Sequence, residues 1–103
     1  AATVVELNAV VTRRLPPEKV RLVDRLLRTW NVEIVPFDEE QSKIASRAYA
    51  DYGKGSGHPA QLNLGDCFSY ALASAASAPL LFIGSDFVHT DVEPAYLPPA
   101  DHP

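Results

Sequence analysis

Three acidic side chains occupy positions where a carboxylate is either costly or useful. Glu6 has mostly apolar neighbours at helical spacing, Asp66 lies in the first turn of an expected helix, and Asp86 follows an expected apolar strand. Each position also suits an ordinary role: Glu6 as a rim residue that reaches solvent, Asp66 as a helix cap, and Asp86 as a turn residue. A site that collected three or four carboxylates from distant elements would instead bind Mg²⁺ or Mn²⁺, which prefer oxygen ligands.

Other chemistries receive little support from the sequence. Cys67 lies among apolar helix residues with no convincing base beside it, which is typical of a buried structural cysteine. The three histidines, His58, His89 and His102, lack the spacing of zinc ligands, and we expect His58 to form hydrogen bonds within its own loop. That glycine-rich loop, residues 53–59, lacks the Lys-Ser/Thr ending of a phosphate-binding loop.

Helical patterns and short apolar runs alternate along the chain and must position these acids. Four helices are expected, at residues 1–14, from Pro17, from a cap at Asp38, and from a cap at Asn63 to about residue 78. Short strands are expected at 32–35 and 80–83, with a third near 92–96. This order predicts an α/β domain with a parallel sheet flanked by helices, although the strands are few for four helices.

Two of the expected helices carry clear inward stripes. In the second helix the stripe consists of Val20, Val23, Leu27 and Trp30, and in the third it consists of Ile44, Ala45, Ala48 and Tyr52. Arginines and an aspartate line the opposite face of the second helix. We therefore expect these side chains to point inward.

Composition limits the class of protein further. The chain has 103 residues, 47% of them apolar and 21% charged, with one cysteine and a net charge of −4, as expected for one globular domain of a reducing cytosol. Its longest apolar run, residues 78–83, is too short to span a bilayer. All nine basic residues precede Gly55, and the overall acidity argues against nucleic-acid binding by bulk charge. A nuclease remains compatible, because bound metal ions would make an acidic site locally positive.

Residues 57–73 read Gly-His-Pro-Ala-Gln-Leu-Asn-Leu-Gly-Asp-Cys-Phe-Ser-Tyr-Ala-Leu-Ala, and this run resembles the signature of VapC-type toxins. These toxins are PIN-domain ribonucleases of bacterial and archaeal toxin–antitoxin systems. The resemblance continues at residues 79–87, at Thr90-Asp91-Val92 and at residues 2–7, and it covers about residues 1–96 in the family's order. Residues 97–103 are expected to form a flexible tail.

The resemblance implies a function and a site. It implies a PIN-like parallel sheet flanked by helices, and an acidic metal site containing Glu6, Asp66 and Asp86, with Asp91 as a further candidate ligand. The implied cofactor is Mg²⁺ or Mn²⁺, and the implied reaction is cleavage of RNA. The implied partners are a cognate antitoxin that occupies the active-site groove and further copies of the chain in a homodimer or higher oligomer. Such a protein is expected in the cytoplasm, without a membrane partner.

The sequence also departs from the family pattern. Family members begin with an apolar strand ending in the first acidic ligand, and no such segment or methionine is present here, so a sheet lacking the first strand is expected. Ile83 stands where many relatives have a basic residue. We therefore expect this fragment alone to be weakly active or inactive. An antitoxin-binding or dimerisation module without catalysis is an open alternative, and so is a different metal-dependent phosphoesterase.

Overall fold

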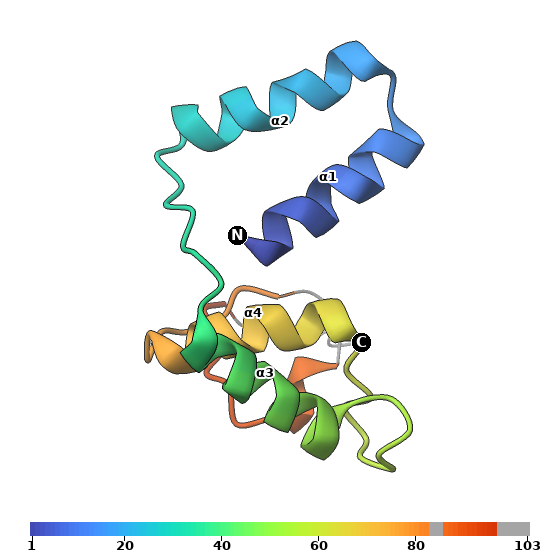
Figure 1. The fold of residues 1–103 in the computed structure, drawn as a ribbon, viewed down its shortest axis with the longest axis vertical. Coiled ribbons are helices and arrows are strands. Elements are labelled where there is room, and N and C mark those ends of the chain that lie inside the picture. The colour runs from blue at the N-terminus through green and yellow to red at the C-terminus, as the bar shows by residue number, and fades with distance from the viewer. Residues whose placement is uncertain (83–85, 97–103) are drawn as a thin grey trace, which may run out of the picture. The chain divides into compact units, whose positions relative to one another are not determined.

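The computed structural model describes residues 1–82 and 86–96 (Figure 1). The chain divides into two compact units, Ala1–Phe37 and Asp38–Pro103, and each is described by itself. Ile83 and the expected tail at 97–103 lie outside the described residues. Within the described residues, no helix combines the length and apolarity needed to cross a bilayer.

The N-terminal unit is a pair of helices, α1 (Ala2–Arg14) and α2 (Pro17–Thr29). Leu15 ends α1 in an extended conformation because the residue before a proline is disfavoured in the α region. Pro17 then occupies the first turn of α2, where its missing N–H costs no hydrogen bond. Asn31 ends α2 in the left-handed region, with φ of 52°, and the next amide, of Val32, donates to the Leu27 carbonyl at 2.9 Å. The expected helices are therefore confirmed.

Two expectations about this unit are wrong. Neither helix contains a fully buried residue, and Trp30, expected to point inward, is 69% exposed. Residues 32–35 form no strand, although the Val35 carbonyl accepts a hydrogen bond from the N-terminal amine at 2.6 Å. A strand needs a neighbour to pair its backbone groups, and no ladder partner for 32–35 is found among the described residues.

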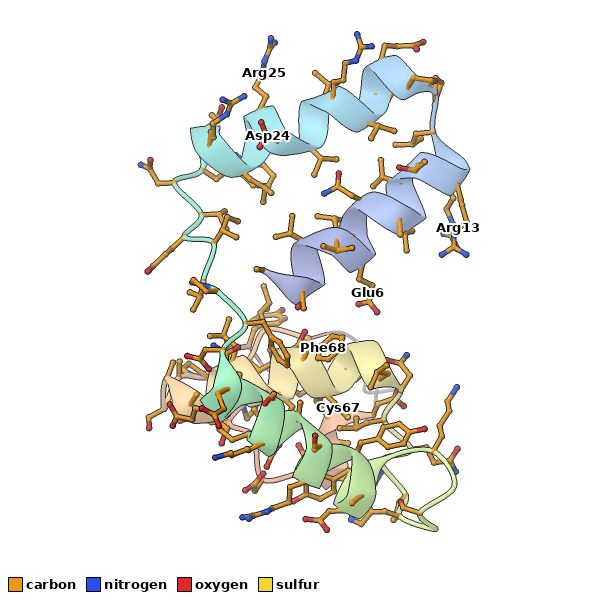
Figure 2. All side chains as sticks on the ribbon, in the orientation of Figure 1. Glu6, Arg13, Asp24, Arg25, Cys67 and Phe68 are labelled. Atoms are coloured by element: carbon orange, nitrogen blue, oxygen red, sulfur yellow. The ribbon has the colours of Figure 1, made fainter. Side chains whose placement is uncertain are left out.

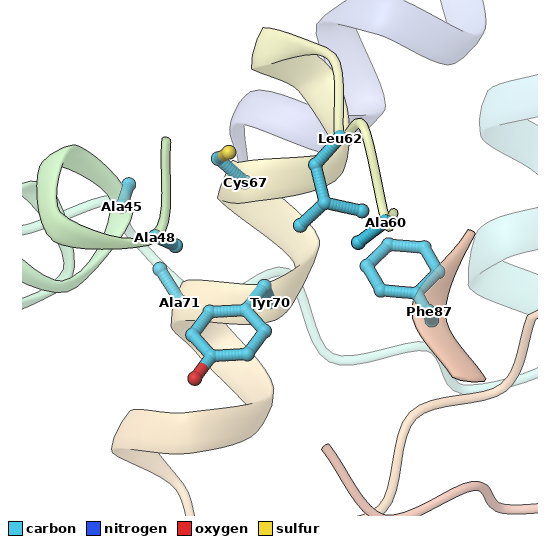
Figure 3. Close-up of a cluster of buried hydrophobic side chains, with 8 residues drawn as sticks. All are labelled: Ala45, Ala48, Ala60, Leu62, Cys67, Tyr70, Ala71 and Phe87. Carbon is cyan, nitrogen blue, oxygen red and sulfur yellow. The ribbon is translucent and has the colours of Figure 1, made fainter. Parts of the chain in front are cut away.

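The C-terminal unit is built on two packed helices, α3 (Glu39–Tyr52) and α4 (Leu64–Ala75). The Asp38 side chain caps α3 by accepting a hydrogen bond from the Gln41 amide at 2.9 Å. Figure 3 shows the buried cluster between and beside these helices. It consists of Ala45, Ala48, Ala60, Leu62, Cys67, Tyr70, Ala71 and Phe87. The alanines let the helix backbones approach closely, so the stripe expected on the third helix is confirmed at Ala45 and Ala48.

Helix α4 ends at Ala75, three residues before the expected end. Ser77 takes a left-handed conformation, with φ of 50°. Its amide donates to the Ser74 carbonyl at 3.2 Å, and the Ala78 amide donates to the Ala73 carbonyl at 2.9 Å. This pair of bonds is a Schellman motif, which satisfies the last carbonyls and stops the helix.

The expected second and third strands appear as one isolated parallel bridge, between Leu80 and Pro94. The Leu80 amide donates to the Glu93 carbonyl at 2.7 Å, and the Ala95 amide donates to the Leu80 carbonyl at 2.8 Å. A similar bridge joins Gly53 to Leu62 and closes the glycine-rich loop. The described residues therefore contain parallel pairing at single positions but no strand, and the expected sheet is not observed there. A short 3₁₀ helix, η1 (Phe87–His89), precedes the Pro94 bridge.

Candidate functional site

Asp66 lies at the start of α4 in a reciprocal capping box with Asn63. The Asn63 side chain accepts a hydrogen bond from the Asp66 amide at 2.8 Å, and the Asp66 Oδ2 atom accepts one from the Asn63 amide at 3.1 Å. These bonds satisfy backbone donors that the first turn of a helix leaves unpaired. Asp66 therefore has the structural role considered from its sequence position, and this role uses one of its two carboxylate oxygens.

Asp86 precedes η1 and is exposed. Its side chain forms no capping hydrogen bond to η1, so the turn role considered from the sequence is not seen in the described residues. Phe87, the next residue, is buried against Phe82, with ring centroids 5.3 Å apart. The backbone beside Asp86 is thus anchored by an aromatic contact, whereas its carboxylate is directed to solvent.

Glu6 lies on α1 in the N-terminal unit. Its side chain is exposed and projects from the helix (Figure 2). This position agrees with the solvent-reaching role considered from the sequence. The structure places Glu6 only within its own unit.

Asp91 has a partner that the sequence analysis missed. The Tyr70 hydroxyl donates a hydrogen bond to Asp91 Oδ1 across 21 positions of the chain. The Tyr70 side chain is 8% exposed, and its burial, followed by the hydrogen bond and negative charge of Asp91, raises the pKa of the phenol well above its ordinary value. A signal for this pair existed, because a buried tyrosine hydroxyl usually has a hydrogen-bond partner.

Two cavities border the Tyr70–Asp91 pair. One, of about 260 Å³, is lined by Ser74, Ser77 and Glu93 among others, and the second, of about 290 Å³, by Arg47 and Asp51 among others. Both also include Tyr70, Ser74 and Asp91 in their walls. Neither Asp66 nor Asp86 is among the described residues that line these two cavities, so Asp91 lies in different surroundings from these two acids.

The remaining candidates are structural in this fold. Burial raises the pKa of the Cys67 thiol, and the negative charge of Asp66 adds to the shift, so this cysteine stays protonated. The His58 Nδ1 atom accepts a hydrogen bond from the Ala60 amide at 3.1 Å, and its ring meets Tyr52 edge-on at 4.9 Å. The loop-stabilising role expected for His58 is confirmed.

No three histidine, cysteine, aspartate or glutamate side chains come close enough to hold a metal ion within residues 1–82 and 86–96. The structure joins Asp66 to Asn63 and Asp91 to Tyr70. Asp66 and Asp86 belong to the C-terminal unit, whereas Glu6 belongs to the N-terminal unit. The four-carboxylate metal site therefore remains a prediction.

The comparison with known proteins defines the class. The PIN-domain family model matches residues 1–93, and the chain belongs to this α/β family. Its relatives narrow the membership to the VapC type. The chain is 55% identical over 95 residues to VapC ribonuclease Mb2780c of Mycobacterium bovis and to ribonuclease VapC42 of Mycobacterium tuberculosis, covering 92% of this chain and 72% of each relative. It is 45% identical over 95 residues to ribonuclease VapC28 of Mycobacterium tuberculosis, covering 92% of this chain and 71% of that relative. The resemblance drawn from the sequence is confirmed.

Proposed function

We propose that this chain is the toxin ribonuclease of a toxin–antitoxin system, an endoribonuclease dependent on Mg²⁺ or Mn²⁺. One observation carries the proposal: the chain is 55% identical, over 92% of its length, to relatives named as ribonucleases. The PIN-domain match, over residues 1–93, spans the segments that carry Glu6, Asp66 and Asp86.

The acids of the C-terminal unit suit a hard divalent cation. Asp66 keeps one carboxylate oxygen outside its capping bond, and the Asp86 carboxylate is exposed with no capping bond to η1. Carboxylate oxygens are the ligands that Mg²⁺ and Mn²⁺ prefer. We assign Glu6, Asp66 and Asp86 to holding the ion, which when bound would activate water and stabilise charge on the phosphoryl group in the transition state. Asp91 differs from them because the donor to its carboxylate is a buried side chain, the Tyr70 hydroxyl.

The chain's own contribution is to hold these acids in place. The capping box restrains the Asp66 side chain at the start of α4, where the helix dipole favours negative charge. Asp86 is held by the buried Phe87 beside it. Such restraint matters because a catalytic group must keep its geometry within a fraction of an ångström.

The proposal extends to the sheet and the partners. The single parallel bridge between Leu80 and Pro94 supports a parallel sheet of the PIN type in which these two segments are neighbours. Exposed apolar side chains on α1 and at the C-terminal cap of α2, such as Val5 and Trp30, suit a protein partner, for which we propose the cognate antitoxin or a second copy of the chain. A binding module without catalysis is the second candidate, and the same exposed apolar residues favour it.

Cleavage of RNA by the protein expressed from its complete reading frame tests the proposal. We expect endonucleolytic products with Mg²⁺ or Mn²⁺ and none with EDTA. Asp66→Asn should abolish cleavage, since the amide removes the charge that holds the metal. The variant should keep its fold, because the amide oxygen still accepts the Asn63 N–H.

Asp24→Asn is the matched control. Asp24 forms a surface ion pair with Arg28 at 2.9 Å, and exposed pairs of this kind contribute little to stability. Undiminished cleavage by Asp66→Asn would refute the metal-holding role. Metal binding without cleavage of any RNA would favour the binding module. Faster turnover of single-stranded DNA or small phosphoesters would point to a different phosphoesterase.

A further inference from the structure

We propose that Tyr70 and Asp91 form a hydrogen-bonded clasp between α4 and the segment that follows Asp86, and that Asp91 is a positioning residue rather than a metal ligand. The inference rests on the proposed function, because the acids it positions are Asp66 on α4 and Asp86 before η1. It changes the role of the fourth acid in the expected metal site.

The clasp is built from a buried phenol. The Tyr70 ring belongs to the core cluster, and Figure 3 shows its hydroxyl pointing along α4 toward the C-terminal end of the helix. There the hydroxyl donates to Asp91 Oδ1. The raised pKa of Tyr70 keeps the phenol protonated, and therefore a donor, at neutral pH. The bond joins α4 to the segment after η1, and both Leu80 and η1 lie between these two segments in the sequence.

The Tyr70 hydroxyl points away from the start of α4, so its partner Asp91 lies at a distance from Asp66. Ser74, which shares both cavities with Tyr70 and Asp91, follows Asp66 by eight residues. Eight residues correspond to a rise of about 12 Å along a helix axis. A carboxylate beside the second half of α4 is poorly placed to share an ion with one at its first turn, because metal–oxygen bonds are only about 2.0–2.6 Å long.

The clasp instead restrains the backbone around Asp86. Between Asp86 and Pro94 the chain is fastened at three places: Phe87 is buried, Asp91 is bound to Tyr70, and the Glu93 carbonyl accepts the Leu80 amide. The Thr90 hydroxyl, which donates to the Phe87 carbonyl at 2.7 Å, stiffens the turn between the first two fastenings. Asp91 supplies the side-chain hydrogen bond that ties this segment to α4, the helix that also carries Asp66. Loss of the clasp should therefore loosen Asp86 relative to Asp66.

Four variants of the protein expressed from its complete reading frame separate a clasp from a ligand: Tyr70→Phe, Asp91→Asn, Asp91→Ala, and Tyr70→Phe combined with Asp91→Ala. Asparagine keeps an oxygen that accepts from Tyr70 but loses the charge that a metal ligand needs. We expect Asp91→Asn to keep Mn²⁺ affinity within about twofold of wild type, measured by calorimetry, and to keep most RNA cleavage. A fall in Mn²⁺ affinity of more than about tenfold would overturn the proposal, because changes to the groups around a bound metal typically lower its affinity by at least this factor.

Thermal unfolding tests the Tyr70–Asp91 hydrogen bond without a measurement of cleavage. Tyr70→Phe and Asp91→Ala should each lower Tm by about 4–8 °C, and the double variant should lower it no further, because both changes remove one bond. Tyr49→Phe, which removes an exposed hydroxyl on α3, is the matched control and should keep the wild-type Tm. Additive losses in the double variant would overturn the clasp.

The two arms also distinguish this inference from the proposed function. A wild-type protein that cleaves no RNA would refute the proposed function, whereas non-additive Tm losses would still support the clasp. Should Asp91→Ala fail to fold, the nearly isosteric Tyr70→Phe and Asp91→Asn carry the test. If Tyr70 and Asp91 form the clasp, Tyr70→Phe lowers Tm and RNA cleavage more than Asp91→Asn does. The reverse order would overturn it.

Discussion

Asn63 and Asp66 each accept a hydrogen bond from the other's backbone amide, at 2.8 and 3.1 Å, and so form a closed capping box at the start of α4. The arrangement gives Asp66 a capping role and is compatible with the metal-holding role that we propose for it. One carboxylate oxygen caps the helix, and the second is left for the proposed metal. A residue whose type is explained by local structure can therefore also serve a site, and the two roles are separable by substitution.

Removal of the Asn63 side chain should cost stability. We expect Asn63→Ala to lower the free energy of unfolding by about 1 kcal/mol, because the Asp66 amide loses its acceptor. Asn63→Ser should cost only a few tenths of that amount, since its hydroxyl oxygen accepts the same bond. Urea titration of the three proteins measures the difference. Equal stabilities for Asn63→Ala and wild type would mean that the box contributes nothing.

Divalent metal should stabilise the folded protein. At a free Mn²⁺ concentration of about 100 times Kd, binding to the folded state alone raises the free energy of unfolding by about 2.7 kcal/mol. We expect Asp86→Asn to abolish most of this increase, because the substitution removes the negative charge of an exposed carboxylate that forms no capping bond to η1. Thermal unfolding with and without Mn²⁺ measures the effect, with Asp24→Asn as the control. Full Mn²⁺ stabilisation of Asp86→Asn would exclude that carboxylate from the metal site.

Alkaline pH should destabilise the fold through Tyr70. Its pKa is raised in the folded state, so the folded protein holds this proton more tightly than the unfolded chain does. The resulting stability is fully present below the unfolded pKa of about 10 and is lost as pH rises above it. Cys67, whose pKa is also raised, contributes with the same sign above its own ordinary value.

Tyr70→Phe should therefore show a shallower fall in Tm between about pH 9 and pH 11 than wild type. Tyr49→Phe retains the buried phenol of Tyr70 and should fall as steeply as wild type. Scanning calorimetry over this range provides the comparison. Parallel curves for Tyr70→Phe and wild type would contradict the prediction.

The two glycines at the start of the loop before α4 should respond differently to alanine. A Cβ at Gly53 would lie 2.3 Å from the Tyr49 carbonyl oxygen, a backbone atom that cannot rotate away, so we expect Gly53→Ala to cost about 1–3 kcal/mol. At Gly55 the space is open but φ is +87°, and Gly55→Ala should cost about 1 kcal/mol. Urea midpoints rank the variants. A larger loss at Gly55 would show that backbone conformation outweighs the steric contact.

The features predicted correctly depend on short stretches of chain. The starts of α2, α3 and α4 follow from Pro17, Asp38 and Asn63, because prolines and caps act on backbone groups within one helical turn. The burial of Cys67 and the loop bonding of His58 also follow from immediate neighbours. The family signature, likewise, is a continuous run of residues.

The helices, their N-terminal caps and the PIN-domain membership were therefore all predictable from the amino-acid sequence. The pairing of groups that are distant in the chain became visible in the folded structure. The folded structure reduced the second and third expected strands to one bridge, Leu80 with Pro94, and it gave Asp91 a partner in Tyr70. It also left Trp30 exposed despite its place in an apolar stripe. Caps and turns are satisfied by near neighbours in the chain, whereas strands, buried hydroxyls and apolar faces need partners that only folding brings close.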